Sequence, residues 1–289
     1  MKKVDFFIVG APKAGTTSLY HYLNEHFEIE MSSQKEPDFF SDKSLQNQKL
    51  YYGKDRVDTI EKYQLLFQRE DATVRGEASV SYLFYEDVPH KIISYNPTAK
   101  IIIMLRNPVE RAFSHYLMDY RLGLISESFE VIIKKQSKHK NAYLFYQQYI
   151  EVSEYAKQIK RYLEVFPKEN IYFIDYEDFK NDTVEIVHSV FMFLGVNDDF
   201  QPQLRKKHNT YTTPKYEIIR YVYSSVLFRK MLASIFSKNL TKSIRGLLFR
   251  SDKKPKISEE TRDFLKKHFE SDVRELSELL KKDFLKWIR

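Results

Sequence analysis

Residues 6–17 read FFIVGAPKAGTT, and this stretch decides the fold. Its apolar part, Phe6–Val9, is typical of a buried parallel strand, and the two threonines after Gly15 begin a helix. Between them, Gly10 and Gly15 bound a turn whose backbone N–H groups can face an anion closely. The new helix points the positive end of its dipole at that anion, and Lys13 adds a full positive charge. The stretch therefore predicts a phosphate-binding loop between a strand and a helix.

The order of residues in this loop differs from that of the nucleoside-triphosphate loop GxxxxGK[ST]. Both glycines keep the spacing of that motif, but Thr16 occupies its lysine position and the lysine stands inside the loop, at Lys13. This arrangement favours a nucleotide with a single 5′-anhydride over a nucleoside triphosphate. For the loop taken alone, a strand–turn–helix with an incidental lysine is the structural alternative.

A second segment combines a strand with phosphate-binding side chains. Lys100–Leu105 is an uninterrupted apolar run of the kind found in buried parallel strands. Arg106 follows it directly, at the strand end where ligands bind in open α/β sheets. Pro108 then suits the first turn of a helix, and Ser114 lies about two turns into that helix. An arginine and a hydroxyl placed in this way could bind a second phosphate.

Together these segments resemble the sulfotransferases that use 3′-phosphoadenosine-5′-phosphosulfate (PAPS). Residues 12–17 look like that family's 5′-phosphosulfate loop, and residues 106–116 look like its 3′-phosphate motif. Residues 35–40, KEPDFF, are similar to the segment that carries the catalytic glutamate in the branch acting on heparan sulfate and other glycans. Further matches at residues 76–82, 174–179 and 272–287 follow in family order. The resemblance implies a bacterial-type sulfotransferase with a P-loop-like fold.

The resemblance also implies roles for the matched residues. Glu36 would act as general base on the acceptor hydroxyl, and Lys13 would neutralise charge on the leaving phosphate. Arg106 and Ser114 would hold the 3′-phosphate. PAPS is then the co-substrate and 3′,5′-adenosine bisphosphate (PAP) the product, and no metal is required. The nucleotide's 5′-end would be held by Lys13, Ala14, Gly15, Thr16, Thr17 and Ser18, and a basic loop with Arg205 and Lys206 would cover the cofactor.

The acceptor side is expected to be formed by Asp38, Phe39, Glu77 and Tyr82. Heparan-modifying relatives commonly have histidine at the position of Asp38 and lysine at the position of Ala78. Both differences remove positive or proton-shuttling character, so a neutral sugar hydroxyl of a glycan or glycolipid is the expected acceptor. Glu77 is the rival base, with a buried structural role as its alternative. Glu36 taken alone could also be a surface carboxylate.

We expect one domain over residues 1–289, because no linker or repeat divides the chain. The fold class is α/β: a mainly parallel central sheet flanked by helices in three layers, with a helical C-terminal portion. The predicted strands are Val4–Val9, Phe27–Met31, Thr73–Glu77, Lys100–Leu105 and Ile171–Ile174. The predicted helices are Thr17–His26, Thr59–Gln68, Pro108–Leu122, Val152–Phe166 and Thr183–Leu194, the last with Gly195 as C-cap. Further helices are expected to begin at Thr213-Pro214 and after an N-cap at Ser258.

Basic residues concentrate in the C-terminal third. The chain carries 47 basic and 40 acidic residues, and residues 215–256 hold eleven of the basic and two of the acidic ones. Leucine and isoleucine recur there at helical spacing, which predicts a basic amphipathic helix that contacts an anionic membrane or packs its apolar face on the core. Three features bear on the location: the first predicted strand begins near Met1, no apolar run approaches about 20 residues, and cysteine is absent. From these features we expect a cytoplasmic enzyme that is at most peripheral at the inner membrane.

Two other classes of function stay open at this stage. A P-loop kinase acting on a small molecule would bind ATP and Mg²⁺, and Thr16 in the lysine position argues against it. A non-catalytic, membrane-associated binding protein would keep its function without Lys13 or Glu36. Nucleic acid is not expected as a partner, because the basic surplus belongs to no recognised nucleic-acid module.

Overall fold

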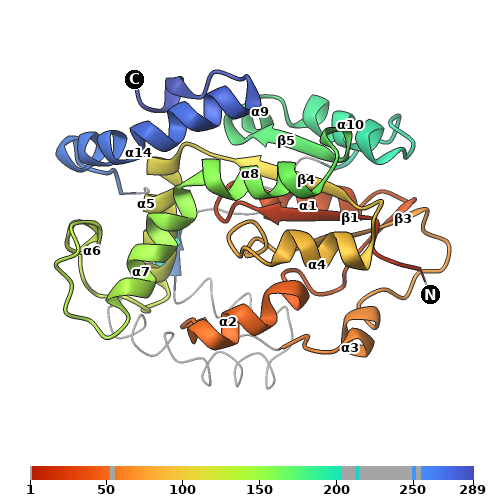
Figure 1. Ribbon diagram of the computed structural model, residues 1–289, viewed down its shortest axis with the longest axis horizontal. Helices are drawn as coiled ribbons and strands as arrows, with labels where there is room; N and C mark the ends of the chain where they lie inside the picture. The colour runs from red at the N-terminus through yellow and green to blue at the C-terminus, as the bar shows by residue number, and fades with distance from the viewer. Residues whose placement is uncertain (1, 53–55, 204–211, 215–248, 252–254) are drawn as a thin grey trace.

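Five strands of the computed structural model form one parallel sheet, and the structure describes residues 2–52, 56–203, 212–214, 249–251 and 255–289 (Figure 1). The strand order is β2-β3-β1-β4-β5. All five strands predicted from the sequence are confirmed, with ends that differ by two residues or fewer. Their bounds are β1 Phe6–Gly10, β2 Ile29–Met31, β3 Val74–Ala78, β4 Lys100–Leu105 and β5 Ile171–Asp175.

The centre of the sheet is buried on both faces, as continuous apolar strands require. Every residue of β1 is buried, and Ile101–Leu105 of β4 have almost no exposed surface. Phe6 of β1 pairs with Gly76 of β3, and a Cβ atom on Gly76 would lie only 2.1 Å from Cζ of Phe6. The phenylalanine ring therefore occupies the space that a side chain at position 76 would need.

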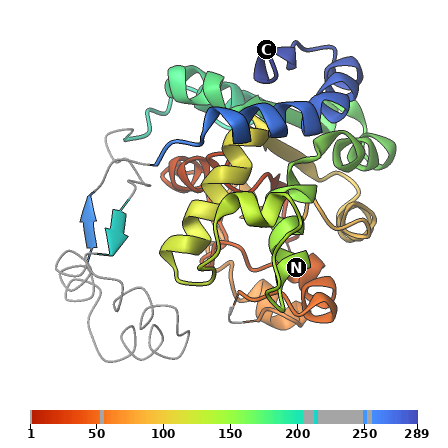
Figure 2. The same cartoon turned by 90° about the vertical axis from the view of Figure 1, so that its left-hand side faces the viewer.

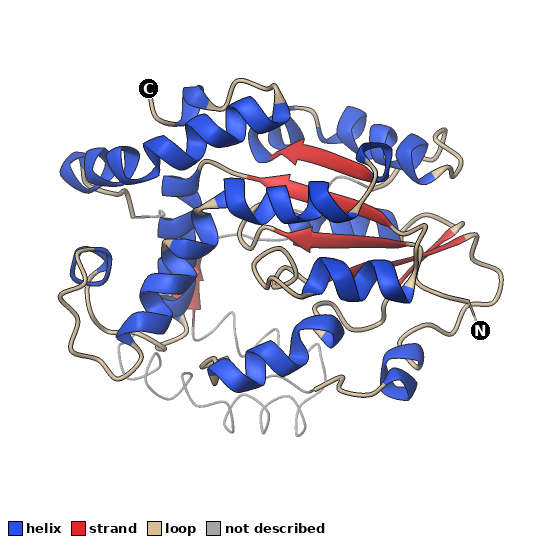
Figure 3. Cartoon of the chain, viewed as in Figure 1, coloured by secondary structure: helices blue, strands red, loops and turns tan. Residues whose placement is uncertain are grey.

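Helices cover both faces of the sheet, which confirms the predicted three-layer α/β architecture (Figures 1 and 3). Helices α1 (Thr16–Asn24) and α10 (Thr183–Leu194) contact each other, as do α4 (Val88–Tyr95) and α8 (Tyr155–Val165). The C-terminal helix α14 (Glu259–Leu280) packs on α8 and on α5 (Pro108–Arg121). The other described α-helices are α2 Asp42–Gln48, α3 Ile60–Gln64, α6 Phe129–Ile133, α7 Ala142–Tyr149 and α9 Tyr176–Asn181. The described 3₁₀ helices are η1 Phe39–Ser41, η2 Glu151–Ser153, η3 Lys168–Asn170 and η4 Leu285–Trp287.

Two predicted helix ends are confirmed by their capping geometry. The Ser258 side chain accepts a hydrogen bond from the Thr261 N–H at the start of α14, and Gly195 ends α10 with a φ of 78°. Helix α14 also caps a neighbour, because the Asp272 carboxylate accepts the Tyr155 and Ala156 N–H groups at 2.8 and 2.9 Å. The C-terminal helix is thus tied to the sheet's own helical layer.

The prediction of a helix beginning at Thr213-Pro214 is wrong at these two residues. They belong to strand β6 (Thr212–Pro214), which pairs antiparallel with β7 (Phe249–Ser251) in a two-stranded sheet set apart from the main sheet (Figure 2). Proline is tolerated in edge strands, and both strands of a two-stranded sheet are edge strands. Residues 215–248 and 252–254 of the predicted basic segment lie outside the described residues.

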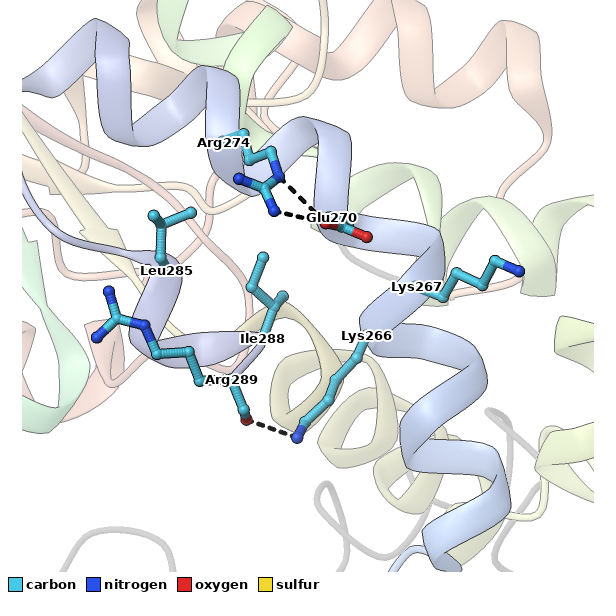
Figure 4. Close-up of a pocket in the computed structure, with 7 residues that line it drawn as sticks. All are labelled: Lys266, Lys267, Glu270, Arg274, Leu285, Ile288 and Arg289. Carbon is cyan, nitrogen blue, oxygen red and sulfur yellow. Dashed lines mark hydrogen bonds and ion pairs between the residues drawn. The ribbon is translucent and has the colours of Figure 1, made fainter.

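A groove of about 310 Å³ lies between α14 and the 3₁₀ helix η4 (Figure 4). Three of its charged side chains have local partners: Arg274 pairs with Glu270 at 2.7 Å, and Lys266 Nζ donates to the Arg289 carbonyl at 2.6 Å. None of the site residues predicted from the sequence lines this groove. Separately, no helix among the described residues combines the length and apolar character needed to cross a membrane.

Candidate active site

The loop between β1 and α1 has the geometry of an anion cradle. Gly15 is the N-cap of α1 with a φ of 95°, and Lys13 has a φ of 69°. No side chain caps the first turn of α1, and that turn carries no acidic residue. The Ser18 N–H donates to the Gly15 carbonyl at 2.9 Å, which leaves the first N–H groups of the helix, those of Thr16 and Thr17, to face an anion.

Lys13 lies against helix α5, among charged groups of both signs. Its Nζ is 3.5 Å from Sδ of Met118. Burial, followed by the positive charge of Arg121, lowers the Lys13 pKa from 10.5 to about 8, with Arg106 acting in the same direction. Asp119 and Glu36 oppose that shift. At neutral pH Lys13 is thus a partly desolvated ammonium, which interacts strongly with an arriving anion.

Arg106 lies where the sequence predicted, directly after β4, and it contacts the loop. Its guanidinium donates a hydrogen bond to the Lys13 carbonyl at 3.0 Å and lies 4.7 Å from the centre of the Tyr176 ring. The Nε of Arg106 is buried and has no hydrogen-bond partner among the described residues. A buried donor without a partner is costly, and an anion bound at this position would satisfy it.

Ser114 lies on α5, as predicted, and is partly exposed. It shares one face of the helix with Met118 and Arg121, since these positions follow at i, i+4 and i+7. The contact between Met118 and Lys13 shows that this face is turned toward the loop. Asn107 fixes the start of the helix by accepting the Val109 and Glu110 N–H groups. The two predicted phosphate-binding segments are therefore brought together.

Glu36 is held in a tight turn between β2 and η1. Its φ is 59°, its N–H donates to the Ala78 carbonyl at 2.9 Å, and its carboxylate pairs with Lys35 at 2.6 Å. The side chain is 28% exposed, so a substrate can reach it. The Glu36 charge opposes the lowering of the Lys13 pKa, so the two groups interact electrostatically.

Glu77, the rival base, has no exposed surface. Its carboxylate accepts hydrogen bonds from the Tyr63 hydroxyl and from Ser79 Oγ, the latter at 2.6 Å. Burial raises its pKa from 4.5 to about 7. Tyr82 is equally buried, and its hydroxyl accepts the Phe40 N–H at 3.2 Å. Burial therefore corrects the expectation that these two side chains contact a substrate: both are part of the core.

Asp38 and Phe39 lie beside Glu36 but serve the local structure. Asp38 is buried with a φ of 56°, and its carboxylate accepts a hydrogen bond from Ser81 Oγ at 2.6 Å. The Phe39 ring stacks on Tyr63 at a centroid distance of 4.5 Å and is only partly exposed. Of the predicted acceptor side, Phe39 thus keeps some accessible surface. Arg205 and Lys206 lie outside the described residues.

Sequence reasoning missed three residues of the site. Tyr176 begins α9 directly after β5 and forms a wall of the loop, because a Cβ on Gly15 would lie 3.1 Å from its ring. Its position after a strand adjacent to β4 was a usable signal. Met118 and Arg121 share a face with Ser114, which helical spacing could have revealed. In the described part of the chain, no cluster of three or more His, Asp or Glu side chains is placed to hold a metal ion.

Comparison with known proteins gives relatives of one kind. The chain is 28% identical to mouse carbohydrate sulfotransferase 15 over 244 residues, covering 66% of this chain and 43% of that protein. It is 26% identical to human bifunctional heparan sulfate N-deacetylase/N-sulfotransferase 3 over 281 residues, covering 96% of this chain and 30% of that protein. The chain therefore spans less than half the length of these two relatives.

Solved structures agree with the sequence relatives. A sulfotransferase from Alicyclobacillus acidocaldarius superposes with a TM-score of 0.73 at 30% identity and full coverage of both chains. A mouse sulfotransferase complexed with PAP shares the fold, with a TM-score of 0.52 at 18% identity, covering 94% of this chain and 85% of that chain. The family model for the sulfotransferase domain matches residues 3–282. The chain belongs to the sulfotransferase family.

Proposed function

We propose that this protein transfers a sulfuryl group from PAPS to a hydroxyl acceptor. The observation that carries the proposal is the contact between the two phosphate-binding segments: Arg106 donates to the Lys13 carbonyl, while its buried Nε has no partner among the described residues. Two cationic side chains, an uncapped helix N-terminus and an unsatisfied donor thus converge at the carboxyl ends of β1 and β4. This set fits a nucleotide with phosphates at two positions.

The residues present fit such a nucleotide as follows. The N–H groups after Gly15, with Thr16, Thr17 and Ser18, would hold the 5′-phosphate, and Lys13 would face its bridging oxygen. Arg106 and Ser114 would hold the 3′-phosphate. PAPS, when bound, supplies the activated sulfuryl group.

The residues of the chain then account for the transfer. Glu36 accepts the proton of the acceptor hydroxyl, whose oxygen forms a bond to sulfur on the side opposite the leaving group. The bond between sulfur and the 5′-phosphate oxygen breaks with its electron pair on the phosphate, so PAP leaves as the anion. Lys13 neutralises the charge that develops on that oxygen. Positioning and charge stabilisation dominate, as in phosphoryl transfer.

The acceptor that we propose is a sugar hydroxyl of a glycan or glycolipid. The relatives' names, carbohydrate sulfotransferase and heparan sulfate N-sulfotransferase, support a carbohydrate. Asp38 and Ala78 replace residues that would favour a highly sulfated acceptor, which supports a neutral sugar. A screen of neutral oligosaccharides against heparan sulfate, with radiolabelled PAPS, tests this choice, and preferential sulfation of heparan sulfate would overturn it.

We further propose a cytoplasmic location with peripheral membrane contact through residues 215–256. The support is their composition, eleven basic against two acidic residues. Co-sedimentation with vesicles of anionic and of zwitterionic lipids tests the contact. Equal binding to both vesicle types, or to neither, would overturn it.

Calorimetric titration with PAP, without metal, tests the proposed function without knowledge of the acceptor. We expect tight binding by the wild type and loss of binding in Arg106→Ala. Arg274→Ala removes a guanidinium that pairs with Glu270 away from the loop, and it should bind PAP like the wild type. Preference for ATP with Mg²⁺ would instead support a kinase, and absence of any nucleotide binding would support a non-catalytic protein.

A further inference from the structure

Behind the loop, helix α5 carries a chain of buried polar side chains. Arg111, His115 and Asp119 follow at i, i+4 and i+8 on one face, and none of the three is more than 3% exposed. The Arg111 guanidinium donates to Ser153 Oγ and to two backbone carbonyls, at 2.6 to 2.8 Å. Burying so many ionisable groups is costly unless they are joined.

The donors and acceptors determine in which direction each hydrogen bond of this series runs. Arg111 can only donate, so His115 Nδ1, at 3.2 Å, accepts from it. The His115 proton is then on Nε2, which donates to the Tyr52 hydroxyl at 2.8 Å. Tyr52 in turn donates to the Asp119 carboxylate at 2.7 Å. Burial and Arg111 lower the pKa of His115, which agrees with a neutral ring between a cation and an anion.

Asp119 is the anionic end of the chain, and its direct partners are neutral. Besides Tyr52, the hydroxyls of Tyr51 and Tyr149 donate to it at 2.6 and 2.9 Å. Burial raises the Asp119 pKa from 3.8 to about 6, and the three hydroxyls oppose that shift. The carboxylate is therefore ionised at neutral pH, and no direct ion pair with its described partners cancels its charge.

That charge acts on the ammonium of Lys13, since each of the two groups shifts the pKa of the other. Met118, the residue before Asp119, contacts Lys13 Nζ through its sulfur. The charged groups that face Lys13 are two cations, Arg106 and Arg121, and two anions, Glu36 and Asp119. The charge of Glu36 is partly offset by its ion pair with Lys35 at 2.6 Å, whereas Asp119 accepts hydrogen bonds from neutral hydroxyls. Asp119 is thus the larger source of negative charge that stabilises the ammonium.

We propose that Asp119 is a positioning residue of the transfer site: it is held as a buried carboxylate by Tyr51, Tyr52 and Tyr149, and its negative charge keeps Lys13 protonated for the nucleotide. This proposal rests on the proposed function, because it concerns the lysine that would bind the 5′-phosphate. It adds a residue outside the phosphate-binding segments matched from the sequence. It also explains the series of hydrogen bonds that begins at Arg111: these bonds hold the Asp119 carboxylate on the protein side of the Lys13 ammonium.

The test is the pH dependence of PAP affinity between pH 7 and 9.5. In the wild type, affinity should be constant at first and fall above a midpoint near pH 8, where Lys13 loses its proton. Asp119→Asn keeps the shape but removes the charge that raises the pKa of Lys13, so its midpoint should move down by about half a pH unit or more. Lys13→Met should abolish the step.

Two further variants separate charge from structure. Ser153→Ala removes a hydrogen bond to Arg111 but leaves Asp119 charged, so its midpoint should equal that of the wild type. The double variant Tyr51→Phe, Tyr149→Phe removes two donors that favour the ionised carboxylate. The pKa of Asp119 should then rise, so that less of the carboxyl is ionised near pH 8, and the midpoint should fall toward that of Asp119→Asn, which provides a second route if that variant does not fold.

The midpoints of these variants distinguish the role of Asp119 from the proposed function. A lowered midpoint in Asp119→Asn, or in the double variant, with Ser153→Ala unchanged supports the role of Asp119. A wild-type midpoint in Asp119→Asn and in the double variant overturns it while the proposed function stands. A wild type that binds no PAP at any pH refutes the proposed function, and the role of Asp119 falls with it.

Discussion

Replacement of Gly15 by alanine tests whether the loop between β1 and α1 is the cradle for the 5′-phosphate. Gly15 has a φ of 95°, a region that residues with a Cβ atom adopt at a cost of about 1–2 kcal/mol. The new Cβ would also lie 3.1 Å from Tyr176 Cδ2 and 3.3 Å from Met104 Cε. The Tyr176 ring stacks on Arg106, so strain at position 15 reaches both phosphate-binding segments.

The matched control is Gly195→Ala. Gly195 also has a positive φ, 78°, but a Cβ there would meet nothing within 4 Å. Both variants should therefore lose about 1–2 kcal/mol of unfolding free energy from the backbone alone, measured by urea denaturation. Only Gly15→Ala should also weaken PAP binding, tenfold for each 1.4 kcal/mol of strain that the bound loop must absorb.

Calorimetric PAP titrations of the two variants decide the matter. Wild-type affinity in Gly195→Ala with at least tenfold weaker binding in Gly15→Ala would support the cradle. Unchanged PAP affinity in Gly15→Ala, with the stability loss present, would refute the assignment of this loop to the 5′-phosphate.

Three further predictions concern the core and the base. Gly76→Ala should cost about 3 kcal/mol or more in urea denaturation, because the new Cβ would overlap the Phe6 ring; wild-type stability would refute the packing described. Burial raises the Glu77 pKa to about 7, so the wild type loses stability as pH rises from about 4.5 to 7. Glu77→Gln lacks this loss and should gain about 2.5 kcal/mol relative to the wild type between pH 5 and pH 8, and a pH-independent difference would contradict it. Glu36→Gln should keep PAP affinity while turnover, measured on an acceptor found in the screen, falls about 10²- to 10⁴-fold; near-normal turnover would assign the base elsewhere.

The sheet was predictable because its signals are local. Apolar runs such as Ile101–Leu105 favour burial in a central strand, and the glycines of the first loop fix where β1 ends and α1 begins. Helix α10 was predicted to the residue, since Gly195 adopts the left-handed conformation at its end. Short helices such as α2 carry no comparable pattern, because their seven residues present no buried face.

The choice between Glu36 and Glu77 shows where local reasoning ends. Both carboxylates stand near matched segments, and their residue types are the same. The difference arises from Tyr63, fourteen residues before Glu77, which closes over one carboxylate and donates to it. Sequence spacing does not reveal that contact. The helical prediction at Thr213-Pro214 failed for a similar reason: its partner strand, Phe249–Ser251, is remote in the chain.

The charges of the site also come partly from residues that the sequence indicates and partly from residues that only the fold brings near. The sequence indicates Lys13 and Arg106 as cations, and two adjacent cations in a partly buried place repel each other. Burial, then the positive charge of Arg121 and, to a smaller extent, that of Arg106 lower the pKa of Lys13 to about 8. Asp119 offsets part of this positive charge, and the buried Nε of Arg106 has no hydrogen-bond partner among the described residues. An anionic ligand would accept a hydrogen bond from this donor and neutralise the neighbouring cations. Phosphate binding would therefore recover free energy that burying these groups costs.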